Sequence, residues 1–366
     1  MRKFLVLFAI LLSLPAMARE DIEVVNIENA AVQAYMADST YYYNNDYKTS
    51  VITKYNTDRY GKRLYWPQGK KVTWTPTVSA DSIREIRVTV SEHSNFHQPI
   101  TFNTFSKSDS SYVIRNNLPN RQYYYKVEEF LVNGEVNRVA QGVYRTVGQV
   151  RMIQVDNCSN VRDLGGWPTQ YGVRVKYGLL FRSANLDRIT SKGLHDFVDN
   201  LNVRAELDLR SESKLNYSKL GKDKDFLLLH HGAYISGLQK RSQVYVTDLR
   251  WIIARLKEGK SVDWHCAIGC DRCGTVSFLI EGLLGMSEID ICRDYELSTL
   301  SLGKKNKRTR SSLKSMFNYI RGFGPGNDLA QCFYNYWLSL GMREGELNYF
   351  LEKMLGESIF VVDSAQ

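Results

Sequence analysis

A short strand, a tight loop and a long apolar helix follow one another between residues 262 and 285. The strand is predicted over residues 262–265, and residues 273–284 are apolar on most sides before Gly285 ends the run. A helix that is apolar all round is buried, and glycine directly after a helix is a typical terminator. A strand that leads straight into a buried helix is typical of an α/β layer with a parallel sheet.

The rest of the second half of the chain agrees with that layer. From residue 150 onward, strand-like and helix-like patterns alternate, and Val246, Leu249, Ile253 and Leu256 recur at helical spacing within residues 243–257. We therefore expect an α/β domain over residues 150–356, with a central, mostly parallel sheet flanked by helices.

The region before it has the two-residue period of strands. Ile86, Val88 and Val90 alternate with polar residues, and Asn133-Gly134 predicts a hairpin turn. We expect an all-β, immunoglobulin-like sandwich over residues 71–148, preceded by a Tyr-rich segment, residues 19–70, that we leave unassigned. With Leu118-Pro119 and Tyr123 near the position of a tyrosine corner, the region resembles a fibronectin type III module. Such a module would be a spacer or a platform for a protein partner.

The first 18 residues have the pattern of a secretory signal peptide. Arg2 and Lys3 precede an apolar run over residues 4–14, and Ala16-Met17-Ala18 supplies a cleavage site. The run is too short to span a bilayer comfortably, so we expect an exported protein, periplasmic or secreted, without a transmembrane segment. The net charge of +9 is spread along the chain. It favours anionic partners in general, and we do not expect nucleic acid as a partner.

The loop between the strand and the buried helix carries a candidate chemistry. Cys266 precedes Arg272 by six positions, with Gly269 between them. A loop that enters a helix N-terminus directs backbone N–H groups at one centre, which binds phosphate and lowers the pKa of a cysteine there. Arg272 supplies a planar fork for phosphate oxygens. The predicted reaction is attack of the Cys266 thiolate on phosphorus, followed by hydrolysis of the cysteinyl-phosphate, without a metal or cofactor.

Residues 265–274 resemble the H-C-x-x-G-x-D-R-T-G signature of bacterial tyrosine phosphatases, a branch of the cysteine-dependent phosphatases that also includes lipid phosphatases. Four further segments, at residues 160–167, 181–186, 207–210 and 294–298, resemble segments of the same family in the same order. The resemblance covers roughly 200 residues. It implies hydrolysis of phosphate monoesters, above all protein phosphotyrosine, with phosphoinositides or inositol polyphosphates as the alternative substrates.

The resemblance also implies a general acid and a phosphate cradle. Asp271, inside the loop, is the first candidate for the acid, and Asp208, at the end of a predicted strand, is the second. His265 is expected to hold the loop by hydrogen bonds. The residues expected to bind the substrate are Ala267, Ile268, Gly269, Cys270, Cys273, Gly274 and Arg182.

The sequence departs from the family at two loop positions. Cys270 stands where the family commonly has Lys, which weakens the phosphoinositide interpretation, and Cys273 stands where it has Thr or Ser. A thiol is a weaker hydrogen-bond donor than a hydroxyl, so an inactive phosphate-binding module is an alternative. Cys270 and Cys273 also form a C-x-x-C pair, which leaves open a redox site or a zinc site, although a zinc site would need two further ligands. A disulfide of Cys270 with Cys266 or Cys273 that switches the enzyme off is a further alternative.

Overall fold

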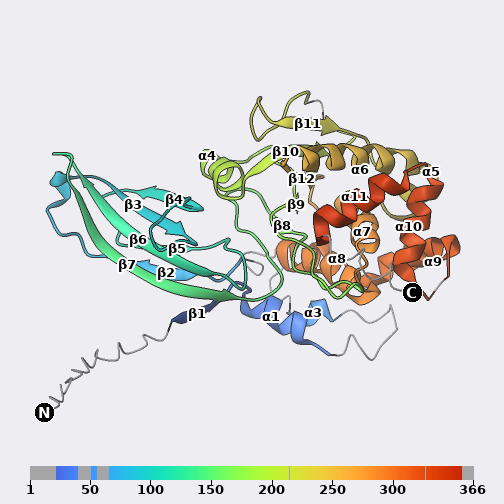
Figure 1. Cartoon of the computed structure of the whole chain (residues 1–366), viewed down its shortest axis with the longest axis horizontal. Helices are drawn as coiled ribbons and strands as arrows, with labels where there is room; N and C mark the ends of the chain where they lie inside the picture. The colour runs from blue at the N-terminus through green and yellow to red at the C-terminus, as the bar shows by residue number, and fades with distance from the viewer. Residues whose placement is uncertain (1–21, 40–50, 56–65, 214, 326, 357–366) are drawn as a thin grey trace, which may run out of the picture.

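The computed structural model describes residues 22–39, 51–55, 66–213, 215–325 and 327–356. These residues form an all-β region near the N-terminus and a larger α/β region (Figure 1). The predicted signal peptide, residues 1–18, and parts of the unassigned segment lie outside the described residues. None of the helices in the described ranges is long and apolar enough to cross a bilayer.

The all-β region is built around one antiparallel core of strands. Its strands are β2 (Lys70–Thr73), β3 (Ile83–Ser91), β4 (Thr101–Phe105), β5 (Ser111–Ile114), β6 (Gln122–Leu131) and β7 (Val136–Val147). Strands β4, β3, β6 and β7 pair antiparallel, and β2 pairs with β5 in a separate two-stranded sheet. Ile86, Val88 and Val90 are fully buried, which confirms the predicted alternation. Gly134, with φ of +92°, lies in the predicted turn between β6 and β7.

The segment left unassigned from the sequence joins the two regions. Strand β1 (Glu23–Asn26) pairs in parallel with β7 of the all-β region. Helices α1 (Ala30–Ala37) and α3 (Ile52–Tyr55) then contact α8 (Glu288–Leu302) of the α/β region. The buried Tyr35 hydroxyl donates to Oε2 of Glu296 at 2.8 Å. Residues 22–37 therefore tie a strand of one region to a helix of the other.

The α/β region contains the predicted central sheet. Its strands are β8 (Arg162–Asp163), β9 (Leu180–Ser183), β10 (Val203–Asp208), β11 (Asp225–Leu228) and β12 (Ser261–His265). The spatial order is β11-β10-β12-β9-β8, and every pair is parallel except β8 with β9. The prediction of a mostly parallel sheet is thus confirmed, and β12 lies at its centre.

Helices cover both faces of this sheet. They are α4 (Ser191–Leu194), the π-helical turn η2 (His195–Asn200), α5 (Tyr234–Lys240), α6 (Ser242–Lys257), α7 (Asp271–Leu283), α8, α9 (Lys314–Ile320), α10 (Leu329–Ser339) and α11 (Glu344–Leu355). Leu180 packs into the large cluster with α6 and α7, whereas its neighbour Phe181 packs with Phe197 on the other face. A sheet buried on both faces needs apolar strands, which the sequence provides. The predicted helix over residues 243–257 is α6, and the predicted buried helix is α7.

Candidate active site

The loop from Cys266 to Arg272 connects the central strand β12 to the N-terminus of α7. Gly269 has a φ of +70°, and a Cβ there would lie 2.5 Å from the carbonyl oxygen of Ser183. Only glycine fits this turn, since L residues avoid such a φ and a real Cβ cannot approach so closely. The carboxyl end of a central parallel strand is where α/β sheets place their ligands, so the predicted loop is at the expected edge.

Cys266 lies at the floor of this loop, with 2% of its surface exposed. Its pKa is well below the ordinary value for a thiol, chiefly because of the neighbouring Cys273 thiol, whose sulfur also lies 3.7 Å from the carbonyl oxygens of Ser183 and Trp264. Burial opposes this shift, and the backbone N–H groups of Cys273 and Ile268 and the charge of Arg272 add to it. The loop therefore favours the thiolate form of Cys266, as a helix N-terminus is expected to do.

Arg272 extends from the first turn of α7 toward the outer side of the loop. Its two terminal nitrogens donate to the two carboxylate oxygens of Glu212, each at 3.1 Å, and one of them lies 3.4 Å from the Leu209 carbonyl oxygen. The side chain of Glu212 is 54% exposed. A carboxylate therefore occupies the fork that bidentate recognition of phosphate would use.

Arg182 lies behind the loop and does not face the site where a substrate would bind. Its guanidinium is fully buried, pairs with Asp294 at 2.7 Å and donates to the carbonyl oxygens of Gly269 and Cys270 at 3.0 and 3.2 Å. The expectation that Arg182 binds substrate disagrees with this placement, because no part of its side chain is accessible. It is a positioning residue for the loop.

Asn160 and Arg162 hold the same side of the loop. The Asn160 amide donates to the carbonyl oxygens of Ile268 and Gly269 at 3.1 and 3.0 Å, and Arg162 donates to the Asn160 amide oxygen at 2.8 Å. Arg162 also pairs with Asp294 through two nitrogens. Three of the segments noted in the sequence thus meet at the back of the loop.

The other residues predicted to bind substrate divide into exposed backbone and buried side chains. The side chains of Cys270 and Cys273 are fully buried, so only their backbone can face a phosphate. The N–H of Gly274 donates to the Cys270 carbonyl at 2.6 Å and is not available, which corrects its assignment. A Cβ on Gly274 would lie 2.9 Å from the Tyr295 ring, so this glycine allows close packing of α7 on α8. Ala267 is fixed through its carbonyl, which accepts from Asn185 at 2.6 Å.

Asp271, the first candidate for the general acid, is engaged in a network at the rim. Its carboxylate accepts from two nitrogens of Arg308 at 2.7 and 2.9 Å and from the Tyr234 hydroxyl, which also contacts the Tyr295 hydroxyl. Burial raises the pKa of Asp271, but the hydrogen bonds from Arg308 and Tyr234 outweigh it and lower the pKa. These donors fix the Asp271 carboxylate at the rim of the loop, and its role as the general acid stays a prediction.

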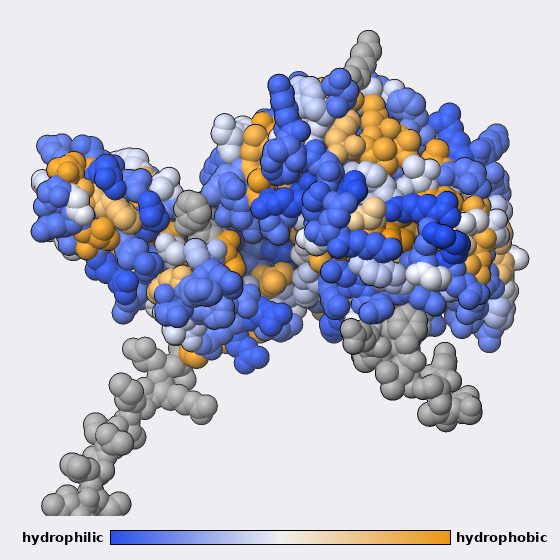
Figure 2. Space-filling view, turned by 45° about the horizontal axis from the view of Figure 1, so that its top comes forward, coloured by the Kyte–Doolittle hydropathy of each residue, from blue (hydrophilic) through white to orange (hydrophobic). Residues whose placement is uncertain are grey.

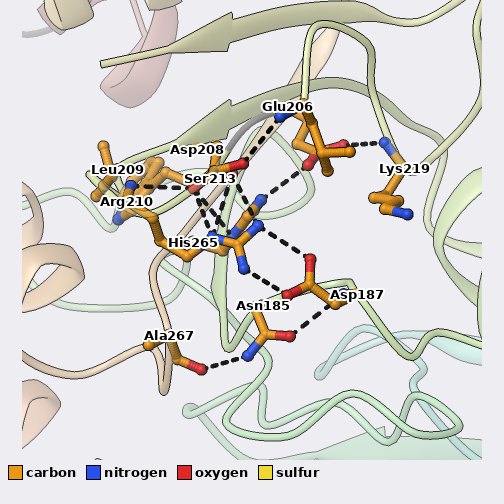
Figure 3. Close-up of polar contacts among 12 residues, drawn as sticks. Asn185, Asp187, Glu206, Asp208, Leu209, Arg210, Ser213, Lys219, His265 and Ala267 are labelled. Atoms are coloured by element: carbon orange, nitrogen blue, oxygen red, sulfur yellow. Dashed lines mark hydrogen bonds and ion pairs between the residues drawn. The ribbon is translucent and has the colours of Figure 1, made fainter. Parts of the chain in front are cut away.

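Asp208, the second candidate, is fully buried beside His265 (Figure 3). Both of its oxygens accept from Arg210, at 2.9 to 3.2 Å. These contacts lower the pKa of Asp208 although burial opposes them. Asp208 is therefore also a deprotonated structural partner, and the ion pair with Arg210 accounts for its position.

His265 and Asp187 complete this network. The His265 Nε2 lies 2.8 Å from Glu206 and its Nδ1 lies 3.8 Å from Asp208, with no exposed surface on any of the three side chains. His265 thus fixes the strand end from which the loop departs, as expected. Arg210 donates from its terminal nitrogens to Asp187 at 2.6 and 3.0 Å, so one guanidinium connects a buried carboxylate to a half-exposed one (Figure 3).

The tyrosine phosphatase family matches this chain over residues 153–231 and 229–339, together more than half of its length. The chain belongs to the tyrosine phosphatase family. The enzyme is therefore a hydrolase of phosphoric monoesters, and the match includes β12, the Cys266–Arg272 loop and α7.

Solved structures of phosphatases are similar to part of this chain. The core catalytic domain of the PP-IP phosphatase SIW14 from S. cerevisiae is 15% identical, with a TM-score of 0.30, covering 44% of this chain and 95% of that one. TpbA from P. aeruginosa is 16% identical, with a TM-score of 0.31, covering 46% and 96%. Tk-PTP in its active form is 19% identical, with a TM-score of 0.28, covering 39% and 94%. No curated protein gave a significant match.

Three residues of this phosphatase site were not found from the sequence: Glu212, Arg308 and Tyr234. Glu212 follows the strand end at Asp208 by four positions, and an acidic side chain there was the available signal. Arg308 belongs to a basic run over residues 304–310, which in sequence is typical of a solvated loop or of a patch that attracts polyanionic substrates. In the structure its half-buried side chain pairs with Asp271. Among the described residues, no group of three or more His, Cys, Asp or Glu side chains is arranged to hold a metal ion.

Proposed function

We propose that the protein is an exported cysteine-dependent phosphatase that hydrolyses protein phosphotyrosine through a cysteinyl-phosphate on Cys266. The observation that carries this proposal is the Cys266 sulfur, a thiolate at the floor of a loop whose backbone N–H groups and Arg272 can hold a phosphate. The low exposure of Cys266, 2% of its surface, supports an aryl ester. A phosphate on the long tyrosine side chain reaches a recessed nucleophile more easily than one on serine.

The reaction follows from these groups. The thiolate attacks phosphorus in line with the ester oxygen, while loop N–H groups and the Arg272 fork neutralise charge on the three other oxygens. For Arg272 to take up phosphate, its hydrogen bonds with Glu212 must open or turn outward. Water then cleaves the sulfur–phosphorus bond and regenerates the thiolate.

Hydrolysis of para-nitrophenyl phosphate, with reductant and chelator present, tests the proposal against Cys266→Ser. We expect turnover in the parent protein and none in the variant. A phosphotyrosine peptide should then be preferred over a phosphoserine peptide and over inositol phosphates. Equal activity of the variant, or metal dependence, would contradict the thiolate mechanism.

We further propose that the all-β region, residues 71–148, is a fibronectin type III-like module that offers a surface to a protein partner. The Tyr123 hydroxyl supports this assignment, since it lies 3.1 Å from the Leu118 amide nitrogen and 3.4 Å from its carbonyl oxygen. Such a bond to upstream backbone is the mark of a tyrosine corner. Pull-down of partners with and without residues 71–148 tests this role.

Export is proposed from the sequence of residues 1–18. Expression of the full chain in a bacterium, followed by N-terminal sequencing of the periplasmic fraction, tests it. We expect a mature protein that begins at Arg19, whereas an uncleaved cytoplasmic product would contradict export.

A further inference from the structure

The rim around the Cys266–Arg272 loop carries different charges on its two sides. Beside Arg272, the rim is lined by the carboxylates of Glu212 and Asp187, which are about half exposed. Beside the preceding loop residue, Asp271, it is lined by the basic run that follows α8, and Arg308 of this run pairs with Asp271. An anionic group of a substrate is therefore attracted to the second side and repelled by the first.

The contact between Arg308 and Asp271 is an ion pair that solvent reaches. The Nε atom and one terminal nitrogen of Arg308 lie 2.7 and 2.9 Å from the two carboxylate oxygens. The side chains of Arg308 and Asp271 are 20% and 31% exposed. An ion pair open to water holds its partners weakly, and a carboxylate or phosphate from a substrate fits the same planar fork.

The fold holds Arg308 at the rim through its backbone. Its N–H donates to Oγ1 of Thr299 in α8 at 2.7 Å, and the Thr299 hydroxyl donates to its carbonyl oxygen at 2.9 Å. Two positions further on, the N–H of Arg310 donates to the buried carboxylate of Glu296 at 2.7 Å. Because this backbone is already fixed, the guanidinium loses less conformational freedom on binding an anion than that of a mobile surface arginine does.

Arg308 lies on the side of the loop where the leaving group is expected. Asp271 is the predicted general acid, so its carboxyl has to reach the ester oxygen that leaves with the tyrosine. A cation bonded to Asp271 is therefore beside the tyrosine and its neighbours in the peptide. The side chains of Lys305 and Lys307 are exposed close to Arg308 in the chain, and they add to the positive potential there.

We propose that Arg308 binds a second anionic side chain of the substrate, a carboxylate or a phosphate next to the phosphotyrosine. This rests on the proposed function. When such a peptide binds, the phosphotyrosine phosphate occupies the loop and Arg272, and the fork of Arg308 turns from Asp271 to the second anion. The enzyme therefore prefers phosphotyrosine in an acidic or doubly phosphorylated sequence to phosphotyrosine among neutral residues.

Peptides that differ only beside the phosphotyrosine test this proposal. The residue directly before or directly after it is Gln, Glu or phosphoserine, and the tyrosine fluorescence that appears on hydrolysis is followed. For the parent protein, we expect kcat/KM to be about tenfold higher with Glu or with phosphoserine than with Gln at one of the two positions, as for a hydrogen bond between charged groups. Comparison of Glu with phosphoserine shows which anion is preferred. The preference should shrink at high ionic strength.

The variant Arg308→Gln should remove this preference. Its kcat/KM for the Gln peptide and for para-nitrophenyl phosphate, which has no second anionic group, should stay close to that of the parent. Arg308→Lys should keep part of the preference, because it retains the charge without the fork. Arg250→Gln is the matched control, since Arg250 in α6 pairs with Glu346 through the same two kinds of nitrogen. It should change none of these values.

The proposal is overturned if the parent hydrolyses the Gln, Glu and phosphoserine peptides equally well, or if the preference survives in Arg308→Gln. An equal loss on every substrate in Arg308→Gln would also overturn it and would make Arg308 a positioning residue for Asp271. The proposed function itself fails differently. The parent would then not hydrolyse para-nitrophenyl phosphate, or Cys266→Ser would remain active.

Discussion

The ion pairs behind the Cys266–Arg272 loop and those in front of it differ in exposure. Behind the loop, Arg162 and Arg182 share Asp294, and no side chain of the three is more than 1% exposed. In front, Arg272 pairs with a carboxylate that is 54% exposed. Buried pairs cost several kcal/mol to break, whereas exposed pairs contribute 0–1 kcal/mol. We call the Arg162–Asp294–Arg182 cluster the back of the site and the Arg272–Glu212 pair its front. The back therefore sets the shape of the loop, and the front can rearrange when phosphate binds.

In Figure 2, hydrophilic side chains cover most of the visible face of the molecule, with apolar patches between them. The exposed carboxylates at the rim, Glu212 and Asp187, are each held by an arginine. A phosphate dianion would compete with these carboxylates for cations that are already positioned.

The largest effect on stability is expected when the buried ion pairs at the back of the site are broken. Asp294→Asn removes the carboxylate that the buried Arg162 and Arg182 share, so the free energy of unfolding should fall by about 3–5 kcal/mol. Burial raises the pKa of Asp294, but the two arginines outweigh it and lower the pKa. Its contribution is therefore complete at neutral pH and is lost as the pH falls through the folded-state pKa. Urea unfolding at pH 7 measures the loss.

The control for Asp294→Asn is the removal of an exposed carboxylate, Asp187. Asp187→Asn removes an exposed partner of Arg210, which keeps Asp208, so we expect a loss of at most about 1 kcal/mol. Equal losses in the two variants would remove the distinction between buried and exposed pairs.

The next effect concerns activity at the front. Arg272→Lys replaces a planar fork by a point charge, which cannot donate to two phosphate oxygens at once. We expect kcat/KM to fall by about 10²–10³-fold, while the melting temperature changes little because the lost pair is exposed. Arg250→Lys, at an exposed pair with Glu346, should change neither quantity. A loss of stability as large as in Asp294→Asn would place Arg272 among the structural pairs.

The sequence predicted the front of the site better than its back. Cys266 and Arg272 lie in one short loop, so their spacing was enough to propose them as a site, and the predicted strand and helix on either side are present. The partners of Arg182 lie at positions 269, 270 and 294, on segments that meet only when α8 packs beside the loop. Sequence spacing carries no information on such contacts, so Arg182 was assigned to the substrate.

The surroundings of Asp271 were not predictable for a similar reason. The motif indicates a carboxylate in the loop, but its protonation depends on Arg308, which is brought to it from beyond α8. Likewise, the Tyr-rich segment gave no clear period, and its β1 and α1 became visible only through their pairing with β7 and α8. Fold class and nucleophile were local properties of the sequence; charge states and inter-region contacts were not.

A smaller effect is expected on the pKa of Cys266 when its neighbour Cys273 is changed. Cys273→Ala removes the neighbouring thiol, which is the largest cause of the low pKa of Cys266. A hydrogen bond to a charged group contributes about 1.5–3 kcal/mol, so the pKa of Cys266 should rise by about one to two units. The rate of alkylation by iodoacetamide at pH 6 should fall, and Cys273→Thr should restore it. An unchanged rate in Cys273→Ala would assign the low pKa to the backbone and Arg272 alone.

The smallest effect tests whether the front pair competes with phosphate. Glu212→Gln keeps the size of the side chain but removes the charge that holds Arg272. Since an exposed pair contributes about 0.2–1 kcal/mol, inorganic phosphate should inhibit the variant up to about fivefold more strongly, and the gain should shrink as salt screens the pair. The inhibition constant at low and high ionic strength measures this. Weaker inhibition of the variant would mean that Glu212 orients Arg272 for phosphate and does not compete with it. The exposed Arg272–Glu212 pair would then have a structural role, like the buried pairs behind the loop.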